Sequence, residues 1–78
     1  MSLSRGELDM SKFVERLTML RQEKHLSQPA VAAVMGVTKR TYQRYEAGTG
    51  EPQMTPLIRL ADFYKVSLDY LTGRTDER

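Results

Sequence analysis

The middle of the chain holds four long polar side chains at positions that share one face of a helix, at about 100° per residue: Lys39, Arg40, Gln43 and Arg44. Lysine and arginine donate hydrogen bonds to phosphate oxygens and to the major-groove edge of guanine, and glutamine can pair with adenine. These cations stand in a stretch without any acid, residues 26–45, whereas all ten acids lie in the flanks. The pattern favours contact with a polyanion. A solvated, charged helix face is the alternative that charge alone leaves open.

Residues 39–47, which carry these side chains, have the start and stop signals of a helix. A threonine precedes them as an N-cap, and a glycine follows them as a left-handed stop. On a helical wheel, Tyr42 and Tyr45 fall almost opposite the long donors, while Glu46 falls on the seam between the two sides. We therefore expect the tyrosines to pack inward and the donors to project.

A second helix is predicted just upstream, over residues 28–35. Ser27 caps it, and Pro29 is tolerated in its first turn. Its small side chains would let another helix approach closely: Ala30, Ala32 and Ala33. Gly36 supplies a positive φ for a three-residue turn into the basic helix. Two helices joined in this way, the second one basic, make the helix-turn-helix unit that enters the DNA major groove; a generic pair of antiparallel helices is the alternative.

Three further segments are predicted helices because their apolar residues recur at helical spacing: residues 12–25, 56–65 and 68–72. Either Asp9 or Ser11 caps the first, Thr55 caps the second and Ser67 caps the third. No run alternates with a period of two for long enough to form a strand. The fold class is therefore all-α, and five short helices must bury their apolar stripes against one another.

The length of 78 residues supports one domain, which we place at residues 11–73. A flexible arm, residues 1–10, is expected before it, and a polar tail, residues 74–78, is expected to fray after it. No apolar run approaches the length of a membrane span, and the first ten residues lack the apolar core of a secretory signal.

The composition argues against a catalytic or metal-binding site. The chain has no cysteine and a single histidine, so it can form neither a disulfide nor a thiolate metal site. No cluster of Asp or Glu suggests a metal site, and no spacing of Ser, His and Asp suggests a nucleophile. We therefore expect no enzyme, no catalytic residue, no metal and no other cofactor. The absence of cysteine also fits a cytoplasmic protein.

From Phe13 to about Thr72 the chain resembles the phage-repressor or Cro-like helix-turn-helix family of bacterial and phage regulators. The matching features are Arg21, 26-LSQ-28, Val31-Ala32, 35-MGV-37, 45-YEAG-48, Pro52 and 66-VSLDYL-71. Pro29 and Ala30 depart from the pattern, since acidic residues are common there, and Tyr42 stands where the family usually has Ile or Val. The resemblance implies a compact five-helix bundle of the lambda-repressor type that binds double-stranded DNA.

The resemblance and the helical wheel together assign roles to individual side chains. The four long donors of helix 39–47 are expected to contact base edges, with Arg44 left open between a base and the DNA backbone. Gln28 is expected to contact phosphate, since the family places a glutamine there, and Thr38 and Thr41 are expected to be caps or phosphate contacts.

A structural ion pair between Arg21 and Glu46 is also expected. Arg21 lies within the apolar sector of the first helix, and Glu46 lies at the edge of the packed side of the third. A buried charge without a partner costs several kcal/mol, so each needs the other or an equivalent. The resemblance implies the same pair.

The expected partner is a palindromic DNA operator, bound by a homodimer. One small module reads too few base pairs to select a site, and two copies would read half-sites about one helical turn apart. We expect the loop of residues 49–53 and the apolar side chains of the last helix to form the dimer contact: Val66, Leu68, Tyr70 and Leu71. No obligatory small molecule is expected.

A repressor of phage or bacterial origin is the simplest function. An antitoxin that binds its operator and a controller protein of a restriction–modification operon look alike at this length. The alternative from another class is a helical protein-interaction module whose basic helix, residues 39–47, binds an acidic partner protein.

Overall fold

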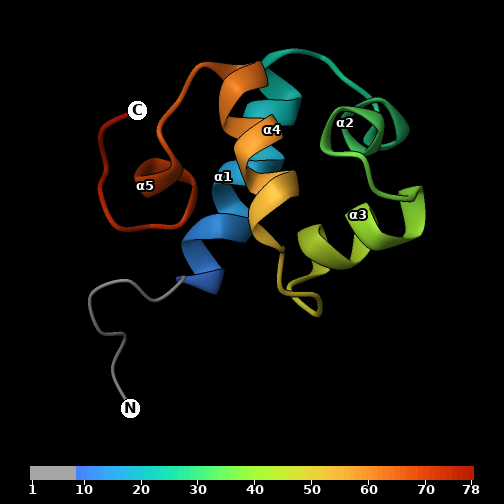
Figure 1. The fold of residues 1–78 in the computed structure, drawn as a ribbon, viewed down its shortest axis with the longest axis horizontal. Coiled ribbons are helices and arrows are strands. Elements are labelled where there is room, and N and C mark those ends of the chain that lie inside the picture. The colour runs from blue at the N-terminus through green and yellow to red at the C-terminus, as the bar shows by residue number, and fades with distance from the viewer. Residues whose placement is uncertain (1–8) are drawn as a thin grey trace.

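Five short helices account for the regular structure of residues 9–78, the part of the chain that this computed structural model describes (Figure 1). They are α1 (Met10–Glu23), α2 (Gln28–Met35), α3 (Lys39–Ala47), α4 (Met54–Tyr64) and α5 (Leu68–Leu71). Residues 9–78 contain no strand, which confirms the all-α prediction. None of their helices is long and apolar enough to cross a membrane.

Side-chain caps begin four of the five helices, as the sequence predicts. In each case the capping side chain accepts a hydrogen bond from the amide three residues further on: Asp9, Ser27, Thr38 and Ser67. The exception is α4, which begins two residues before its predicted start, and Gln53 at its N-cap position makes no side-chain hydrogen bond. The prediction that Thr55 caps it is wrong. Pro56 is accommodated in the first turn because the amides there have no partner within the helix.

Residues in the left-handed conformation follow three of the helices. Gly36 ends α2 with φ 75°, Gly48 ends α3 with φ 78° and Lys65 ends α4 with φ 57°. The first helix ends at Glu23, two residues earlier than predicted, because His25 also takes a positive φ of 55°. Each of these residues turns the chain sharply, and the short connections that result keep neighbouring helices close.

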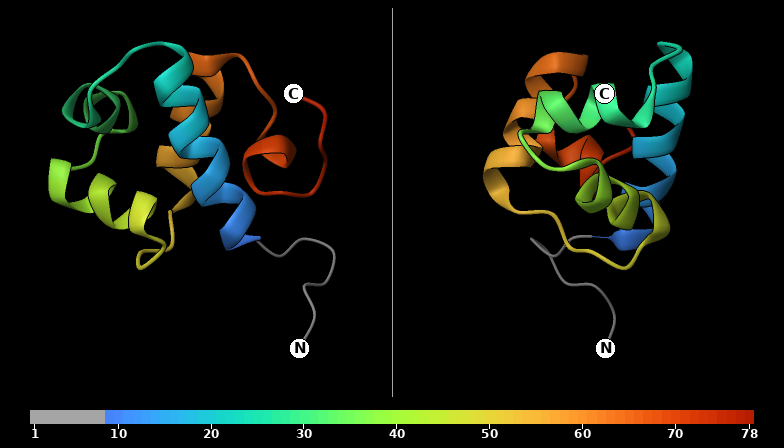
Figure 2. Two further views of the ribbon diagram at one scale, coloured as in Figure 1. Left: turned by 180° about the vertical axis from the view of Figure 1, so that it is seen from behind. Right: turned by 90° about the vertical axis from the view of Figure 1, so that its right-hand side faces the viewer.

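The helices contact one another in a ring with the order α1, α3, α2, α4, α5 and back to α1. Figures 1 and 2 show α2 and α3 together at one end of the molecule and α5 at the other. Side chains from all five helices fill the centre of the ring and are fully buried: Phe13, Leu17, Val31, Tyr42, Leu60 and Leu71. Of the three small residues expected to admit a neighbouring helix, only Ala32 is buried; Ala30 and Ala33 face solvent.

Both ends of the described chain bond to segments that are distant in the sequence. At the start, the Asp9 amide donates to the Thr72 carbonyl at 2.9 Å, and residues 1–8 of the expected arm lie outside the described residues. At the other end, the Arg78 guanidinium pairs with Glu23 near the end of α1. The Arg78 carbonyl also accepts a hydrogen bond from the Ser67 amide. The expectation that residues 74–78 fray is therefore wrong.

A buried arginine, which the sequence did not reveal, holds the tail in place. The side chain of Arg16 donates to the carbonyls of Tyr70 and Thr75 and to the carboxylate of Asp76, at 2.5, 2.7 and 2.6 Å. Its guanidinium also lies 4.2 Å from the centre of the Tyr70 ring. Arg16 falls outside the apolar stripe of α1, and α5 and the folded-back tail together cover it.

Candidate nucleic-acid interface

The helix α3 has one packed side and one exposed side. Tyr42 and Tyr45 are buried, and the Tyr45 ring meets that of Phe13 edge-on at 6.2 Å. The four long donors on the opposite side are all exposed: Lys39, Arg40, Gln43 and Arg44. Among residues 9–78 the side chains of the three cations have neither an ion-pair nor a hydrogen-bond partner, so their charges are available to an external anion.

The turn between α2 and α3 fixes how the donors are presented. Gly36 adopts a left-handed conformation, and a β-carbon added there would lie 2.1 Å from the Arg59 Nη1. The Thr38 hydroxyl oxygen then accepts from the Thr41 amide at 3.1 Å and donates to the Thr41 hydroxyl at 3.0 Å. Thr38 therefore caps α3, and Thr41 lies in its first turn and bonds to the cap. At this end of the helix the amides of the first turn have no intrahelical partner and, with the helix dipole, favour an anion.

An ion pair between Arg21 and Glu46 ties α3 to α1, as predicted. The Arg21 Nε lies 2.7 Å from the Glu46 Oε2, and the Arg21 Nη1 also donates to the Leu26 carbonyl. The Tyr42 hydroxyl, which needed a partner at the edge of the core, donates to the same carboxylate. The two charged side chains are only 18% and 11% exposed, so water screens the pair weakly.

The hydrogen bonds around Glu46 decide its charge state. Burial alone would raise the pKa of this carboxyl, but donors on Arg21, Tyr42 and Gln28 outweigh burial and bring its pKa below the ordinary value of 4.5. Burial, helped by the neighbouring Glu46 carboxylate, raises the pKa of the Tyr42 hydroxyl far above 10. At neutral pH the site therefore holds a carboxylate, a guanidinium and a neutral phenol.

Gln28, at the start of α2, links this buried pair to the exposed face of α3. Its Nε2 donates to the Glu46 Oε1 at 3.0 Å, and its Oε1 accepts from the Gln43 Nε2 at 3.1 Å. From the sequence we expected separate roles for Gln28, Gln43 and Glu46, and the hydrogen bonds that join them were not predicted. The three-residue turn was the available signal, because it folds the start of α2 back alongside the middle of α3.

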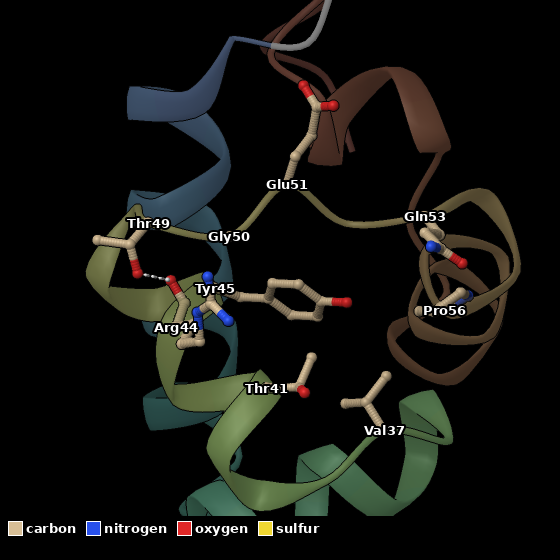
Figure 3. Close-up of a pocket in the computed structure, with 9 residues that line it drawn as sticks. All are labelled: Val37, Thr41, Arg44, Tyr45, Thr49, Gly50, Glu51, Gln53 and Pro56. Carbon is tan, nitrogen blue, oxygen red and sulfur yellow. Dashed lines mark hydrogen bonds between the residues drawn. The ribbon is translucent and has the colours of Figure 1, made fainter.

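A hollow of about 420 Å³ adjoins α3 on the side of the loop that leads to α4 (Figure 3). It is lined by Val37, Thr41, Arg44, Tyr45, Thr49, Gly50, Glu51, Gln53 and Pro56. Figure 3 shows the Thr49 hydroxyl bonded to the Arg44 carbonyl and the Glu51 side chain pointing away from Arg44. The acid therefore leaves the Arg44 charge free, and the loop of residues 49–53 borders the candidate interface.

The expected dimer surface around the last helix is only partly exposed. Leu71 is fully buried in the core, and Tyr70 is buried beneath the Arg16 guanidinium, so neither can contact a second copy. Val66 and Leu68 are only partly buried. The large exposed apolar side chains in the described part of the chain lie on α4 instead: Met54, Ile58 and Phe63.

A family model described as "Helix-turn-helix" matches residues 17–71 of the chain. The chain is 38% identical over 68 residues to the cryptic phage CTXphi transcriptional repressor RstR of Vibrio cholerae, which covers 85% of this chain and 61% of the repressor. It is 37% identical over 65 residues to the HTH-type transcriptional regulator AnsR of Bacillus subtilis, with coverage of 83% and 56%. The chain thus spans about three fifths of the length of the curated relatives it matches.

A solved structure matches the fold over most of the chain. The P22 c2 repressor, in complex with synthetic operator 9T, aligns with a TM-score of 0.74 at 25% identity. The alignment covers 81% of this chain and 96% of the chain in that structure. The five-helix, lambda-repressor-like fold expected from the sequence is confirmed.

Proposed function

Because the chain belongs to the helix-turn-helix family, we propose that it is a cytoplasmic regulator of transcription that binds double-stranded DNA at specific sequences, most simply as a repressor. The exposed side of α3 carries the proposal. Four long donors project from one short helix, and the tyrosines that hold it face the core. An α-helix of this kind fits the major groove, which is about 12 Å wide.

The base contacts come from α3 and the phosphate contacts from its surroundings. Lys39 and Arg40, in the first turn, reach furthest into the groove and donate to guanine, while Gln43 pairs with adenine. Arg44, one turn further on beside the hollow, contacts either a base edge or the backbone. The phosphate contacts come from polar groups at the helix starts, which fix the register of the protein on the duplex: Gln28, Thr38 and Thr41.

Two copies bind a palindromic operator, with half-sites about one turn of DNA apart. Tyr70 and Leu71 take no part in the contact between copies, because they are buried in each one. The contact uses the partly exposed Val66 and Leu68 together with the loop of residues 49–53. Specificity then comes from the product of two half-site readings, since a single module of this size buries roughly 600–1,000 Å² on DNA.

Alanine substitutions on the two sides of the interface test this function. Arg40→Ala should relax base preference at one or two positions and weaken binding to the preferred duplex by about 1–3 kcal/mol. Gln28→Ala should lose a phosphate contact, so it should weaken binding without relaxing the preference at the positions that Arg40 reads. Arg74→Ala is the matched control. Arg74 is an exposed arginine that pairs with Asp69 of α5, and α5 lies at the end of the molecule opposite α2 and α3 (Figure 1).

Binding is measured by fluorescence anisotropy on labelled duplexes at two salt concentrations. The proposal fails if Arg40→Ala and Arg74→Ala change binding equally, or if no duplex is bound more tightly than a scrambled one. A protein-interaction module with an acidic partner would give that second result.

A further inference from the structure

Four side chains form a continuous hydrogen-bonded chain from the protein interior to the exposed face of α3. It begins at Arg21, passes through the Glu46 carboxylate and the Gln28 amide, and ends at Gln43. The links measure 2.7, 3.0 and 3.1 Å. The first two members are largely buried, Gln28 is half-buried and Gln43 is exposed.

The carboxylate gives this chain a direction. An ionised carboxylate can only accept hydrogen bonds, so the Gln28 atom that faces Glu46 must be the nitrogen. The Gln28 oxygen is then turned toward α3, and Gln43 can meet it only with its own nitrogen. Both amides would be free to rotate by 180° without Glu46. With Glu46 in place, each has one preferred orientation.

We propose that Glu46 is a positioning residue for base recognition, which acts through Gln28 to fix the orientation of the Gln43 amide. The inference rests on the proposed function. In the fixed orientation one amide hydrogen of Gln43 is used by Gln28, and the second hydrogen and the oxygen remain free. A donor beside an acceptor is the pair that the major-groove edge of adenine requires.

The arrangement separates this role from the role of Glu46 in the fold. Arg21 and Tyr42 already neutralise and hydrogen-bond the carboxylate within the core. The branch through Gln28 leads to the exposed Gln43, where one more hydrogen bond between amides adds little to stability. Its effect falls on recognition, because an amide rotated by 180° presents the donor and the acceptor in the wrong order.

The test compares base preference, not overall affinity. Gln43→Ala first identifies the base position that Gln43 reads, as the position at which preference disappears. Four duplexes that differ only there are then titrated with the full chain carrying Glu46→Gln. A glutamine at residue 46 can donate or accept, so the direction of the chain is lost. We expect the adenine preference to fall about five-fold, the effect of one hydrogen bond. In a Gln43→Ala background, Glu46→Gln should change binding equally on all four duplexes.

Two further variants separate positioning from stability. The hydrogen bonds from Glu46 through Gln28 to Gln43 are called the relay below. Tyr42→Phe removes a hydrogen bond to Glu46 that is not part of the relay, so it should change binding equally on all four duplexes. Gln28→Met breaks the relay while leaving the pair of Arg21 and Glu46 intact, so it should reduce the adenine preference even if Glu46→Gln does not fold. Circular dichroism shows which variants are folded.

The possible results are distinct. An adenine preference that persists in a folded Glu46→Gln or Gln28→Met protein overturns the relay and leaves the proposed function standing. A wild-type preference for another base at the Gln43 position overturns it as well. If the wild-type chain prefers no duplex, the proposed function and the relay fail together.

Discussion

Replacing Arg21 with methionine should destabilise the protein by about 3 kcal/mol, because it leaves the Glu46 carboxylate largely buried without its cation. Removing one partner of a buried ion pair costs roughly 3–5 kcal/mol. The lower end applies here, since hydrogen bonds from Tyr42 and Gln28 still reach Glu46 in the variant. A domain of this size has a stability of about 4–12 kcal/mol, so the variant should remain folded at 25 °C.

A double-mutant cycle isolates the interaction itself. Arg21→Met and Glu46→Gln each leave one member of the pair without its partner, whereas the double variant leaves neither charge. The loss in the double variant should therefore be smaller than the sum of the two single losses, with a coupling of about 1–3 kcal/mol. Urea unfolding followed by circular dichroism measures all four proteins, since the chain has no tryptophan to report by fluorescence. Strictly additive losses would refute the reasoning.

Three other changes have expected outcomes. Gly36→Ala should lower stability by about 1 kcal/mol or more, because φ is 75° and the added carbon would displace the Arg59 side chain; an unchanged melting temperature would contradict this. Tyr64→Phe should leave the unfolding free energy unchanged or raise it by up to about 1 kcal/mol, because the Tyr64 hydroxyl is buried without a partner in the described residues; a clear loss in urea unfolding would show that it has one. Acidification should weaken the fold: the stability that Glu46 contributes is fully present above its unfolded pKa near 4.5 and is lost as pH falls through its lower folded pKa. Stability should therefore fall less steeply below about pH 4.5 in Glu46→Gln than in the wild type, and equal slopes would count against the assignment.

Local signals were enough to predict most of the fold. N-caps such as Ser27 and Thr38 and left-handed glycines such as Gly36 act within a few residues, so the sequence displays them directly. The start of α4 was predicted two residues too late because a proline is tolerated throughout the first turn of a helix. Pro56 was expected as the first residue of α4, and it is the third.

Contacts between distant segments could not be predicted in the same way. Arg16 and Asp76 are sixty residues apart, and nothing local to either indicates that the tail returns to cover α1. The Arg16 guanidinium also covers the ring of Tyr70, which the sequence suggested as a dimer residue. An apolar side chain on a short helix can face inward or outward, and which direction it takes depends on what the rest of the chain brings over it.

The side chains of the candidate site were predicted from the sequence, but the hydrogen bonds between Gln28, Gln43 and Glu46 were not. The wheel of a single helix separates the tyrosines from the donors of α3, and burial confirms that separation. A helical wheel cannot show that Gln28 on α2 bonds to Gln43 on α3, because this hydrogen bond depends on the angle between the two helices. The ion pair of Arg21 and Glu46 was predicted because two charges on packed faces require each other.

Selection of the wild-type chain on a library of random duplexes tests most directly whether α3 reads DNA. The account predicts enrichment of one motif with two-fold symmetry, its half-sites about 10 base pairs apart centre to centre. In a parallel selection with Arg40→Ala, one or two positions of each half-site should lose their preference. Recovery of no common sequence, or of the same motif from both proteins, would contradict the account.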